Sequence, residues 1–418
     1  MTSKPRVVVI GAGLAGVTLA RRLGELGTPA LLVGDEAHRP YNRVLLAEVL
    51  AGRYGPEVVA LPAPAGLLRG RVTGVDRAGR TVRCADGSLI PYDTLVLATG
   101  SNAVLPPLRG LFTPDQERPE RELPEGVHAF RTMDDCLALS KAVRPGVRAV
   151  VVGGGLLGVS AARALAVRGA QVVLAQQAER LMERQLDPAA SALVRRHLTG
   201  LGVEVHTECR VRDVRSTGGA VRSVELADGY ALGADLVVLA CGVRPRVGLA
   251  REAGLDVGKG VLVDDELRTS DPHIRAVGDC AEHAGRVYGL AAPALEQAGA
   301  LAELLAGDGT ARYTGTRSLT RLTLTGPEGP LGGPDSPFDL AAFGETDPRP
   351  GDDVVQLADA TRGTYRKVVV RDDRLVGGVL VGELGTVGAL ARAWEGAEPL
   401  PSDGGPLLHL LTHDGGSR

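Results

Sequence analysis

The stretch VVVIGAGLAG, residues 7–16, carries the strongest structural signal in the chain. Its first four residues are β-branched and predict a strand, and the run Val17–Leu26 predicts a helix directly after the glycines. A G-x-G-x-x-G spacing between strand and helix is typical of a dinucleotide-binding turn. Gly11 makes the tight turn, Gly13 lets the backbone approach a pyrophosphate, and Gly16 lets the helix pack closely on the strand. One such motif can also be an ordinary tight turn, so further signals are needed.

A second stretch of the same kind, AVVVGGGLLG, spans residues 149–158. It predicts a strand, then a glycine-rich turn, then the helix Val159–Arg168. The unit strand, turn, helix, strand therefore occurs twice, over Val7–Gly34 and over Val150–Gln176. The alternative for the second unit is a vestigial fold that binds nothing. We expect it to bind a second dinucleotide through Gly153, Gly155, Leu157 and Gly158.

The pattern around the two units is that of an α/β protein. Strand-like runs alternate with helical ones from Arg6 to about Gly307, as expected of parallel sheets with helical crossovers. The short apolar strands Asp235–Ala240 and Ile274–Val277 are both expected to return the chain to the first sheet. The second Rossmann-type domain would then be nested inside the first.

A third, small α+β domain follows. Asp372 and Asp373 predict a hairpin turn, and Thr386–Trp394 predicts a short closing helix. Gly326–Pro337 is dense in glycine and proline and predicts an exposed loop. The clearest strands are Leu319–Thr325, Val354–Leu357, Arg366–Val370 and Leu375–Leu380. The expected domain limits are 1–112 and 246–311 for the first domain, 113–245 for the second, 312–400 for the third and 401–418 for a flexible tail.

Side chains at the strand ends bear on which nucleotide each unit binds. Asp35 and Glu36 lie where an acid accepts hydrogen bonds from a ribose, and which of them binds stays open because Gly34 holds the usual position. In the second unit Gln176 stands at that position, with Arg180 nearby. An acid there would favour NAD, whereas glutamine and arginine leave both NADH and NADPH open.

Two further segments are expected beneath the first dinucleotide. The stretch DTLVLATGS, residues 93–101, predicts a strand that ends in Ala98, Thr99 and Gly100, a triplet found where a chain crosses back under FAD. In AVGDCA, residues 276–281, Asp279 follows Gly278, so its carboxylate can accept a hydrogen bond from the ribityl chain of a flavin. Each segment alone could be a loop after a buried strand. Because four signals occur in the right order, we expect FAD in the first domain and NADH or NADPH in the second.

The chain resembles the glutathione-reductase-like flavoproteins, and within them the FAD-containing amino-terminal part of NAD(P)H-dependent assimilatory nitrite reductases, besides rubredoxin and ferredoxin reductases. The segments Arg39–Leu46, Arg180–Asp187 and Tyr365–Gly382 carry the local similarity, which covers about residues 5–397. The resemblance implies that Arg43 lies beside the flavin and can bond the FAD pyrophosphate. Nitrite reductase subunits continue into iron–sulfur and sirohaem regions, so the resemblance implies a free-standing electron-transfer unit.

Two departures from the family pattern bear on the chemistry. Ser160 stands where relatives usually carry a glutamate near the nicotinamide. The stretch Tyr41–Val49 contains no cysteine, whereas disulfide reductases place a cysteine pair on this helix and thiol-dependent peroxidases and oxidases place one. Without a thiol relay, electrons are expected to leave the flavin directly.

Composition excludes several functional classes. The net charge is only −3 and the charges are interspersed, so there is no basic stripe for a nucleic acid. No run reaches the ~18 apolar residues of a membrane span, and the amino terminus lacks a secretory cleavage site. The five cysteines form no C-x-x-C pair, which argues against a disulfide framework or a metal site and favours the cytoplasm.

The sequence therefore predicts an FAD-dependent NAD(P)H:acceptor oxidoreductase with no catalytic side chain. Hydride passes to FAD, and electrons then pass to a protein partner: an iron–sulfur protein, rubredoxin, or a nitrite or nitrate reductase. Nitrite or nitrate assimilation is the setting that the resemblance implies. A rubredoxin or ferredoxin reductase, an NAD(P)H oxidase and a flavin-based redox-sensing binding protein remain alternatives. The third domain is assigned either to partner docking or dimerisation, or to covering apolar surface of the FAD-binding domain.

Overall fold

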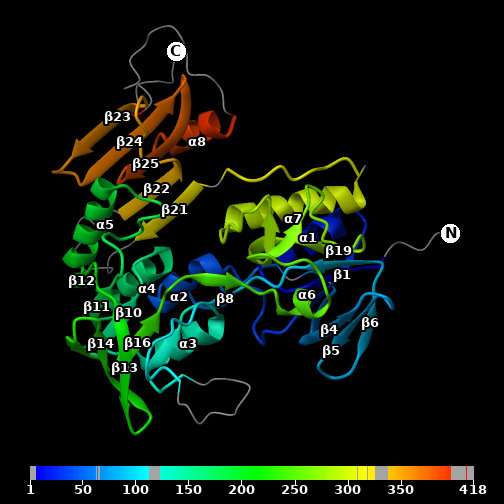
Figure 1. The fold of residues 1–418 in the computed structure, drawn as a ribbon, viewed down its shortest axis with the longest axis horizontal. Coiled ribbons are helices and arrows are strands. Elements are labelled where there is room, and N and C mark those ends of the chain that lie inside the picture. Colours follow the sequence, from blue (N-terminus) through cyan, green and yellow to red (C-terminus); the bar gives the residue numbers. More distant parts are fainter. Residues whose placement is uncertain are drawn as a thin grey trace.

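The computed structural model describes residues 6–62, 64, 66–112, 123–307, 309–317, 319–324, 338–396 and 411. Its first sheet, which contains β1 and β19 in Figure 1, has five parallel strands in the order β19-β7-β1-β2-β3. These strands are β1 (Val7–Ile10), β2 (Ala30–Gly34), β3 (Leu67–Arg69), β7 (Thr94–Leu97) and β19 (Ile274–Ala276). The predicted return of the chain through Ile274–Val277 is confirmed, because β19 pairs with β7.

The second sheet is also parallel and five-stranded, in the order β12-β11-β10-β16-β9. Its strands are β9 (Val127–Ala129), β10 (Arg148–Val152), β11 (Gln171–Ala175), β12 (Glu204–His206) and β16 (Leu236–Leu239). The prediction for Asp235–Ala240 is wrong. This segment forms β16, which lies between β10 and β9 in the second sheet and does not join the first. All four of its residues are buried, which this internal position explains.

Two neighbouring segments of the chain connect the first sheet to the second. The chain leaves the first sheet through β8 (Ser101–Ala103) and returns through β17 (Val243–Pro245), and these two strands pair antiparallel. Because all of the second sheet lies between β8 and β17 in the sequence, one Rossmann-type domain is nested in the other, as predicted.

Each glycine turn opens a helix. Helix α1 (Leu14–Glu25) and helix α4 (Leu156–Val167) begin directly after their N-caps, Gly13 and Gly155. Both start three residues before the predicted helices, because the last glycine of each motif, Gly16 or Gly158, already lies inside the first turn. The remaining helices of these domains are η1 (Arg43–Leu45), α2 (Leu46–Leu50), α3 (Met133–Ala142), α5 (Pro188–Gly200), α6 (Gly248–Glu252), η2 (Gly278–Cys280) and α7 (Ala291–Ala306).

Small sheets decorate both domains and were not anticipated from the sequence. One contains β4 (Val72–Asp76), β5 (Thr81–Cys84) and β6 (Leu89–Pro91), and another contains β13 (Val211–Thr217), β14 (Ala220–Leu226) and β15 (Ala231–Gly233). The strands β18 (Val261–Val263) and β20 (Ala281–His283) form a parallel pair.

The third domain is an antiparallel sheet covered by one helix, coloured from yellow (β21) to red (α8) in Figure 1. Its strand order is β21-β22-β25-β24-β23, and helix α8 (Val387–Gly396) packs on it. The predicted hairpin is confirmed: Asp372 and Asp373 both have positive φ angles, 48° and 55°, which suits a tight turn between β24 and β25. The strands are β21 (Leu319–Leu324), β22 (Phe338–Gly344), β23 (Asp353–Asp359), β24 (Thr364–Arg371) and β25 (Arg374–Val381). The predicted loop Gly326–Pro337 and the predicted tail, save Leu411, lie outside the described residues.

The third domain is fixed to the nested domain by a buried polar contact. Asp187, the N-cap of α5, accepts hydrogen bonds from the Tyr365 hydroxyl at 2.6 Å and from Lys367 Nζ at 2.9 Å. Asp187 is 2% exposed and Lys367 is 7% exposed. The largest apolar cluster also continues from the second sheet into β22, β24 and β25. The third domain therefore covers apolar surface of the nested domain, whereas the sequence-based alternative assigned this cover to the FAD-binding domain.

Candidate functional site

A cleft of about 1700 Å³ runs between the two parallel sheets. Both glycine turns line it, together with η1, the segment after β7, and the start of α7. Pockets for one drug-sized ligand typically measure roughly 300–1,000 Å³, so this cleft has room for two large ligands. The sequence-predicted residues that line it are Gly11, Gly13, Asp35, Glu36, Arg43, Ala98, Thr99, Gly100, Gly153, Gly155, Leu157, Gln176, Gly278 and Asp279.

The first turn needs its three glycines for three different reasons. Gly11 has φ +115°, and a Cβ added there would lie 2.1 Å from the carbonyl oxygen of Ala98. A Cβ on Gly16 would lie 1.9 Å from the carbonyl oxygen of Gly11, so helix α1 can pack on the turn only with glycine there. A Cβ on Gly13 meets no protein atom within 4 Å. Gly13 lines the cleft, so the open space above it is available to a ligand.

The second turn repeats this arrangement. Gly153 has φ +108°, and a Cβ on Gly158 would lie 1.8 Å from the carbonyl oxygen of Gly153. A Cβ on Gly155 meets nothing within 4 Å. Neither α1 nor α4 has an acid in its first turn or a side chain that caps it, so the N–H groups of both helices face the cleft without a competing anion.

The structure separates the two acids that follow β2. Glu36 accepts a 2.7 Å hydrogen bond from the Tyr41 hydroxyl and forms an ion pair with Arg43. Burial raises the pKa of Tyr41, so its hydroxyl stays protonated and keeps donating. Asp35 is exposed on the cleft wall and has no ion pair or side-chain hydrogen bond within the described ranges. Asp35 is therefore the acid that is free to meet a ribose.

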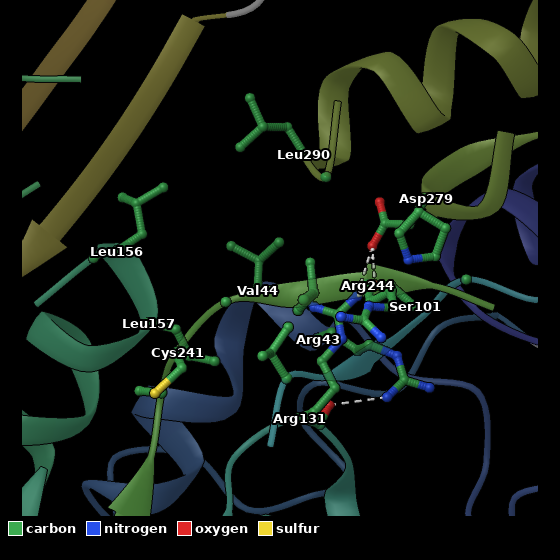
Figure 2. Close-up of a pocket in the computed structure, with 18 of the residues that line it drawn as sticks. Arg43, Val44, Ser101, Arg131, Leu156, Leu157, Cys241, Arg244, Asp279 and Leu290 are labelled. Atoms are coloured by element: carbon green, nitrogen blue, oxygen red, sulfur yellow. Dashed lines mark hydrogen bonds and ion pairs between the residues drawn. The ribbon is translucent and has the colours of Figure 1, made fainter. Parts of the chain in front are cut away.

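A polar cluster joins four segments that are distant in the sequence, as Figure 2 shows. Asp279 Oδ2 accepts hydrogen bonds from Ser101 Oγ at 2.9 Å and from Arg131 Nη2 at 2.6 Å. Arg43 Nη1 donates to the backbone oxygen of Arg131 at 2.9 Å. Burial lowers the pKa of Arg131, an effect that Asp279 opposes. Arg131 Nε is buried and lacks a protein partner within the described part of the chain, and Arg131 is one of the residues that line the cleft.

Sequence reasoning missed Arg131. It lies in the chain between β9 and α3, directly before the N-cap Thr132, and no motif marks it. Only the tertiary fold brings it to Asp279, 148 residues further along the chain.

Near the second glycine turn, Gln176 lines the cleft, whereas Arg180 does not. Gln176 Oε1 accepts a 2.8 Å hydrogen bond from the N–H of Gly154, and Gln176 lines the cleft. The Arg180 guanidinium lies 3.9 Å from Glu179 and 4.0 Å from Asp347 of the third domain, and it does not line the cleft.

The wall between the two glycine turns is apolar. Leu156, Leu157 and Cys241 form one side in Figure 2, and Val44 lies between them and the Asp279 cluster. Ser160, which replaces the usual glutamate, donates its hydroxyl to the backbone oxygen of Leu156 at 2.8 Å and so adds no charge. Burial raises the pKa of the Cys241 thiol to about 11, so this thiol is protonated near neutral pH.

The cleft is strongly cationic although the chain carries a net charge of −3. Against the four acids Asp35, Glu36, Glu183 and Asp279, the lining contains twelve arginines and one lysine. These are Arg39, Arg43, Arg69, Arg109, Arg131, Arg184, Arg210, Arg212, Arg244, Arg246, Arg251, Arg321 and Lys259. Two helix N-termini, open space above Gly13 and Gly155, and this excess of positive charge fit two dinucleotides, each with an anionic pyrophosphate.

Comparison with known families agrees with this geometry. The family model described as pyridine nucleotide-disulphide oxidoreductase matches residues 5–298. The chain belongs to the pyridine nucleotide-disulphide oxidoreductase family. A second model, described as the rubredoxin NAD+ reductase C-terminal domain, matches residues 336–395, which cover most of the third domain. Membership confirms the α/β fold with two Rossmann-type domains, the oxidoreductase class and the predicted cofactors, FAD and NAD(P)H.

Three similar proteins illustrate the range of the family. The nitrite reductase [NAD(P)H] of Bacillus subtilis (strain 168) is 35% identical over 91% of this chain and 46% of its own length. The rubredoxin-NAD(+) reductase of Alcanivorax borkumensis is 33% identical over 75% of this chain and 82% of its own length. In a solved putidaredoxin reductase–putidaredoxin complex, the matched chain is 26% identical with a TM-score of 0.82, over 98% of this chain and 99% of that one. The chain spans about half the length of the nitrite reductases that it matches.

The described residues contain neither a metal-binding cluster nor a membrane-spanning helix. Among them, no three histidine, cysteine, aspartate or glutamate side chains gather closely enough to hold a metal ion. Within the same residues, no helix combines the length and apolar character that crossing a membrane requires.

Proposed function

We propose that this protein takes electrons from NAD(P)H and passes them, through bound FAD, to a protein acceptor. FAD supplies the conversion between a two-electron hydride donor and one-electron transfer. The chain binds and positions the two cofactors, and no side chain acts as an acid or base. The observation that carries the proposal is the single cationic cleft that both glycine turns share, with an apolar wall between them.

For FAD, the proposal assigns residues 1–112 and 246–311. Gly11, Gly13 and the start of α1 hold the pyrophosphate, and Asp35 accepts hydrogen bonds from the ribose. Arg131 and Asp279 act as one polar unit beneath the ribityl chain, because each holds the other in place at 2.6 Å. Ala98, Thr99 and Gly100 pass under the cofactor. Gly16 lets α1 pack closely, Gly278 lets the start of η2 pack closely, and Arg43 lines the same end of the cleft.

For NAD(P)H, the proposal assigns residues 113–245. Gly153, Gly155 and the start of α4 hold the second pyrophosphate, and Gly158 permits the close packing of α4. Leu156 and Leu157 give the nicotinamide an apolar, water-poor surface on the side that faces Val44 and the flavin end. Excluding water there suits hydride transfer, because water would compete for reactive intermediates.

The acceptor is proposed to be a protein that takes single electrons. The stretch Tyr41–Val49, which includes η1 and the start of α2, contains no cysteine. Of the two cysteines that line the cleft, Cys241 has a pKa of about 11 and burial also raises the pKa of Cys209. Thiol–disulfide exchange needs an accessible thiolate, which neither provides. A relative named rubredoxin-NAD(+) reductase, and the solved complex with putidaredoxin, support a small redox protein as acceptor.

The relatives also support a metabolic setting. One is named an assimilatory nitrate reductase electron transfer subunit, and others are nitrite reductases. We therefore propose nitrite or nitrate assimilation as the setting and the cytoplasm as the location, with a homodimer left open.

The test is a panel of acceptors offered to purified, FAD-loaded protein with NADH or NADPH. Ferricyanide and a small iron–sulfur protein such as rubredoxin should be reduced, and glutathione disulfide should not. Comparable turnover with glutathione disulfide would overturn the acceptor class. Steady oxygen consumption that exceeds iron–sulfur protein reduction would favour an oxidase. Reduction of bound FAD without turnover on any acceptor would favour a redox sensor.

A further inference from the structure

The second strand of the nested Rossmann-type domain, β11, ends at Ala175, and Gln176 follows it. In a dinucleotide fold, an acid at the end of this strand bonds the ribose 2′-hydroxyl and repels a 2′-phosphate, whereas a nearby arginine accommodates the phosphate. The two Rossmann-type domains of this chain differ at this position: one has an acid there and the other has a neutral side chain. Asp35, exposed on the cleft wall, follows β2 of the FAD domain, and the neutral Gln176 follows β11.

The uncharged side chain of Gln176 is held in place by two hydrogen bonds within the protein. Its Oε1 accepts the Gly154 N–H at 2.8 Å, and its Nε2 makes a long, 3.4 Å hydrogen bond to the backbone oxygen of Arg180. Both ends of the amide are therefore used within the protein. Gln176 holds the glycine turn in place and presents no negative charge to a nucleotide.

Backbone hydrogen bonds bring a second segment to this point. The backbone N–H of Gln176 donates to the backbone oxygen of His206 at 2.8 Å. The backbone N–H of Cys209 donates to the backbone oxygen of Gln176 at 2.9 Å. Arg210 follows Cys209 directly, is exposed, and lines the cleft. The fold thus places a cation beside the strand end where the usual acid is missing.

A third segment crosses the same turn. The N–H of Met182 donates to the backbone oxygen of Gly154 at 2.9 Å, and Arg184, two residues on, is exposed and lines the cleft. Arg184 and Arg210 form no ion pair in the described ranges of the chain. Glu183, directly before Arg184 in the chain, is also exposed and lines the cleft.

A neighbouring arginine is less available. Arg212 lies 3.7 Å from the carboxylate of Glu225, which also pairs with Arg215. Arg180, the arginine that the sequence suggested, lies near Asp347 outside the cleft. Arg210 and Arg184 are therefore the cations that remain free to meet an anionic ligand at this end.

We propose that the enzyme prefers NADPH over NADH, with Arg210 and Arg184 binding the 2′-phosphate and Gln176 supplying the uncharged strand end that admits it. This inference rests on the proposed function, because it names the nucleotide of the second site. A phosphate dianion between two guanidinium groups forms charge-assisted, directional hydrogen bonds that a ribose hydroxyl cannot replace.

The first experiment needs no turnover. Isothermal calorimetry on FAD-loaded protein compares adenosine 2′,5′-bisphosphate with 5′-AMP, which differ only in the 2′-phosphate. The bisphosphate should bind at least about tenfold more tightly, and R210A with R184A should remove most of that difference while leaving 5′-AMP binding within about threefold. Equal binding of the two ligands by the wild-type protein would overturn the inference.

The second experiment measures kcat/KM for NADPH and for NADH with ferricyanide as acceptor. The wild-type ratio should favour NADPH by at least about tenfold, and the double variant should lower it about tenfold through NADPH alone. Q176E, which can still accept the Gly154 N–H, should lower the ratio as well. R222A is the matched control, since Arg222 is an exposed arginine on β14 outside the cleft. A ratio that falls in R180A and not in R210A with R184A would refute the assignment.

The two experiments separate the inference from the function on which it rests. Selective binding of the bisphosphate without turnover on either nucleotide would retain the phosphate site and reject the proposed reductase activity. Turnover with equal kcat/KM for both nucleotides would retain the activity and reject the phosphate site.

Discussion

Replacing Lys367 by methionine should destabilise the third domain where it contacts the nested domain. Lys367 is one of four lysines in the chain, and its Nζ lies 2.9 Å from Asp187 in a buried contact. Methionine has a similar length and no charge, so the variant leaves the Asp187 carboxylate buried without its cation. The Tyr365 hydroxyl and the Ala190 N–H still donate to that carboxylate, and neither carries a positive charge.

Breaking one partner of a buried ion pair typically costs about 3–5 kcal/mol, because a charge is left uncompensated. The cost should depend on pH. Burial raises the pKa of Asp187, but bonds from Tyr365, Ala190 and Lys367 outweigh this and hold its pKa below the usual 3.8. Because the pKa of Asp187 is lower in the folded state, the contact contributes its full stability to the fold above the usual pKa. That contribution is lost as pH falls below this value. Without Lys367 the pKa rises, so the variant should lose more stability at about pH 8 than at about pH 5.

The assay uses a natural probe. Trp394, the one tryptophan in the chain, lies in α8 with its ring 5.2 Å from Phe343, so its fluorescence reports on the third domain. At a slope of roughly 2 kcal/mol/M, a loss of about 4 kcal/mol lowers the urea midpoint by roughly 2 M. Lys141→Met, at an exposed site at the end of α3, is the control and should change stability by less than about 1 kcal/mol. A Lys367→Met midpoint equal to that of the control would refute the reasoning.

Four further outcomes follow from the structure. Gly13→Val should fold but lose FAD, because a Cβ there meets no protein atom, whereas Gly16→Ala should impair folding; absorbance and circular dichroism measure the two. Arg131→Leu should lower FAD retention on gel filtration about tenfold or more, while exposed Arg144→Leu should not. Glu48→Ala removes the acid paired with fully buried Arg163, so the free energy of unfolding from denaturant titration should fall by about 3–5 kcal/mol. Cys241 should be alkylated on the order of a hundredfold more slowly than an ordinary thiol at about pH 8, the rate rising with pH up to about 11, as mass spectrometry can follow.

Local patterns predicted the parts of the fold that local chemistry determines. Gly11 and Gly153 adopt positive φ angles that other residues rarely take, so the spacing of the glycines in the sequence is enough to locate both turns. The hairpin at Asp372 and Asp373 was predictable for a similar reason, because short polar residues tolerate that conformation.

Strand order could not be read in the same way. Asp235–Ala240 is apolar enough for either parallel sheet, and only its pairing with β10 and β9 assigns it to the second. The short strands of β4–β6 and β13–β15 escaped notice because they are half exposed and carry no sustained run of apolar residues.

The site was predictable where a motif fixes it and not where long-range contacts do. The sequence left Asp35 and Glu36 equivalent, and the contacts of Glu36 with Tyr41 and Arg43 distinguish them. Arg180 was chosen because it lies close to Gln176 in the sequence, yet the loop directs it toward Asp347.

The central claim is that one cleft brings NAD(P)H and FAD together for transfer to a one-electron acceptor. Anaerobic stopped-flow mixing of FAD-loaded protein with NADPH, followed by rubredoxin or ferricyanide in a second mix, tests it most directly. The account predicts that the flavin absorbance band bleaches with the first mix and returns with the second, and that glutathione disulfide does not restore it. A band that never bleaches with either nicotinamide, or that only the disulfide restores, would contradict it.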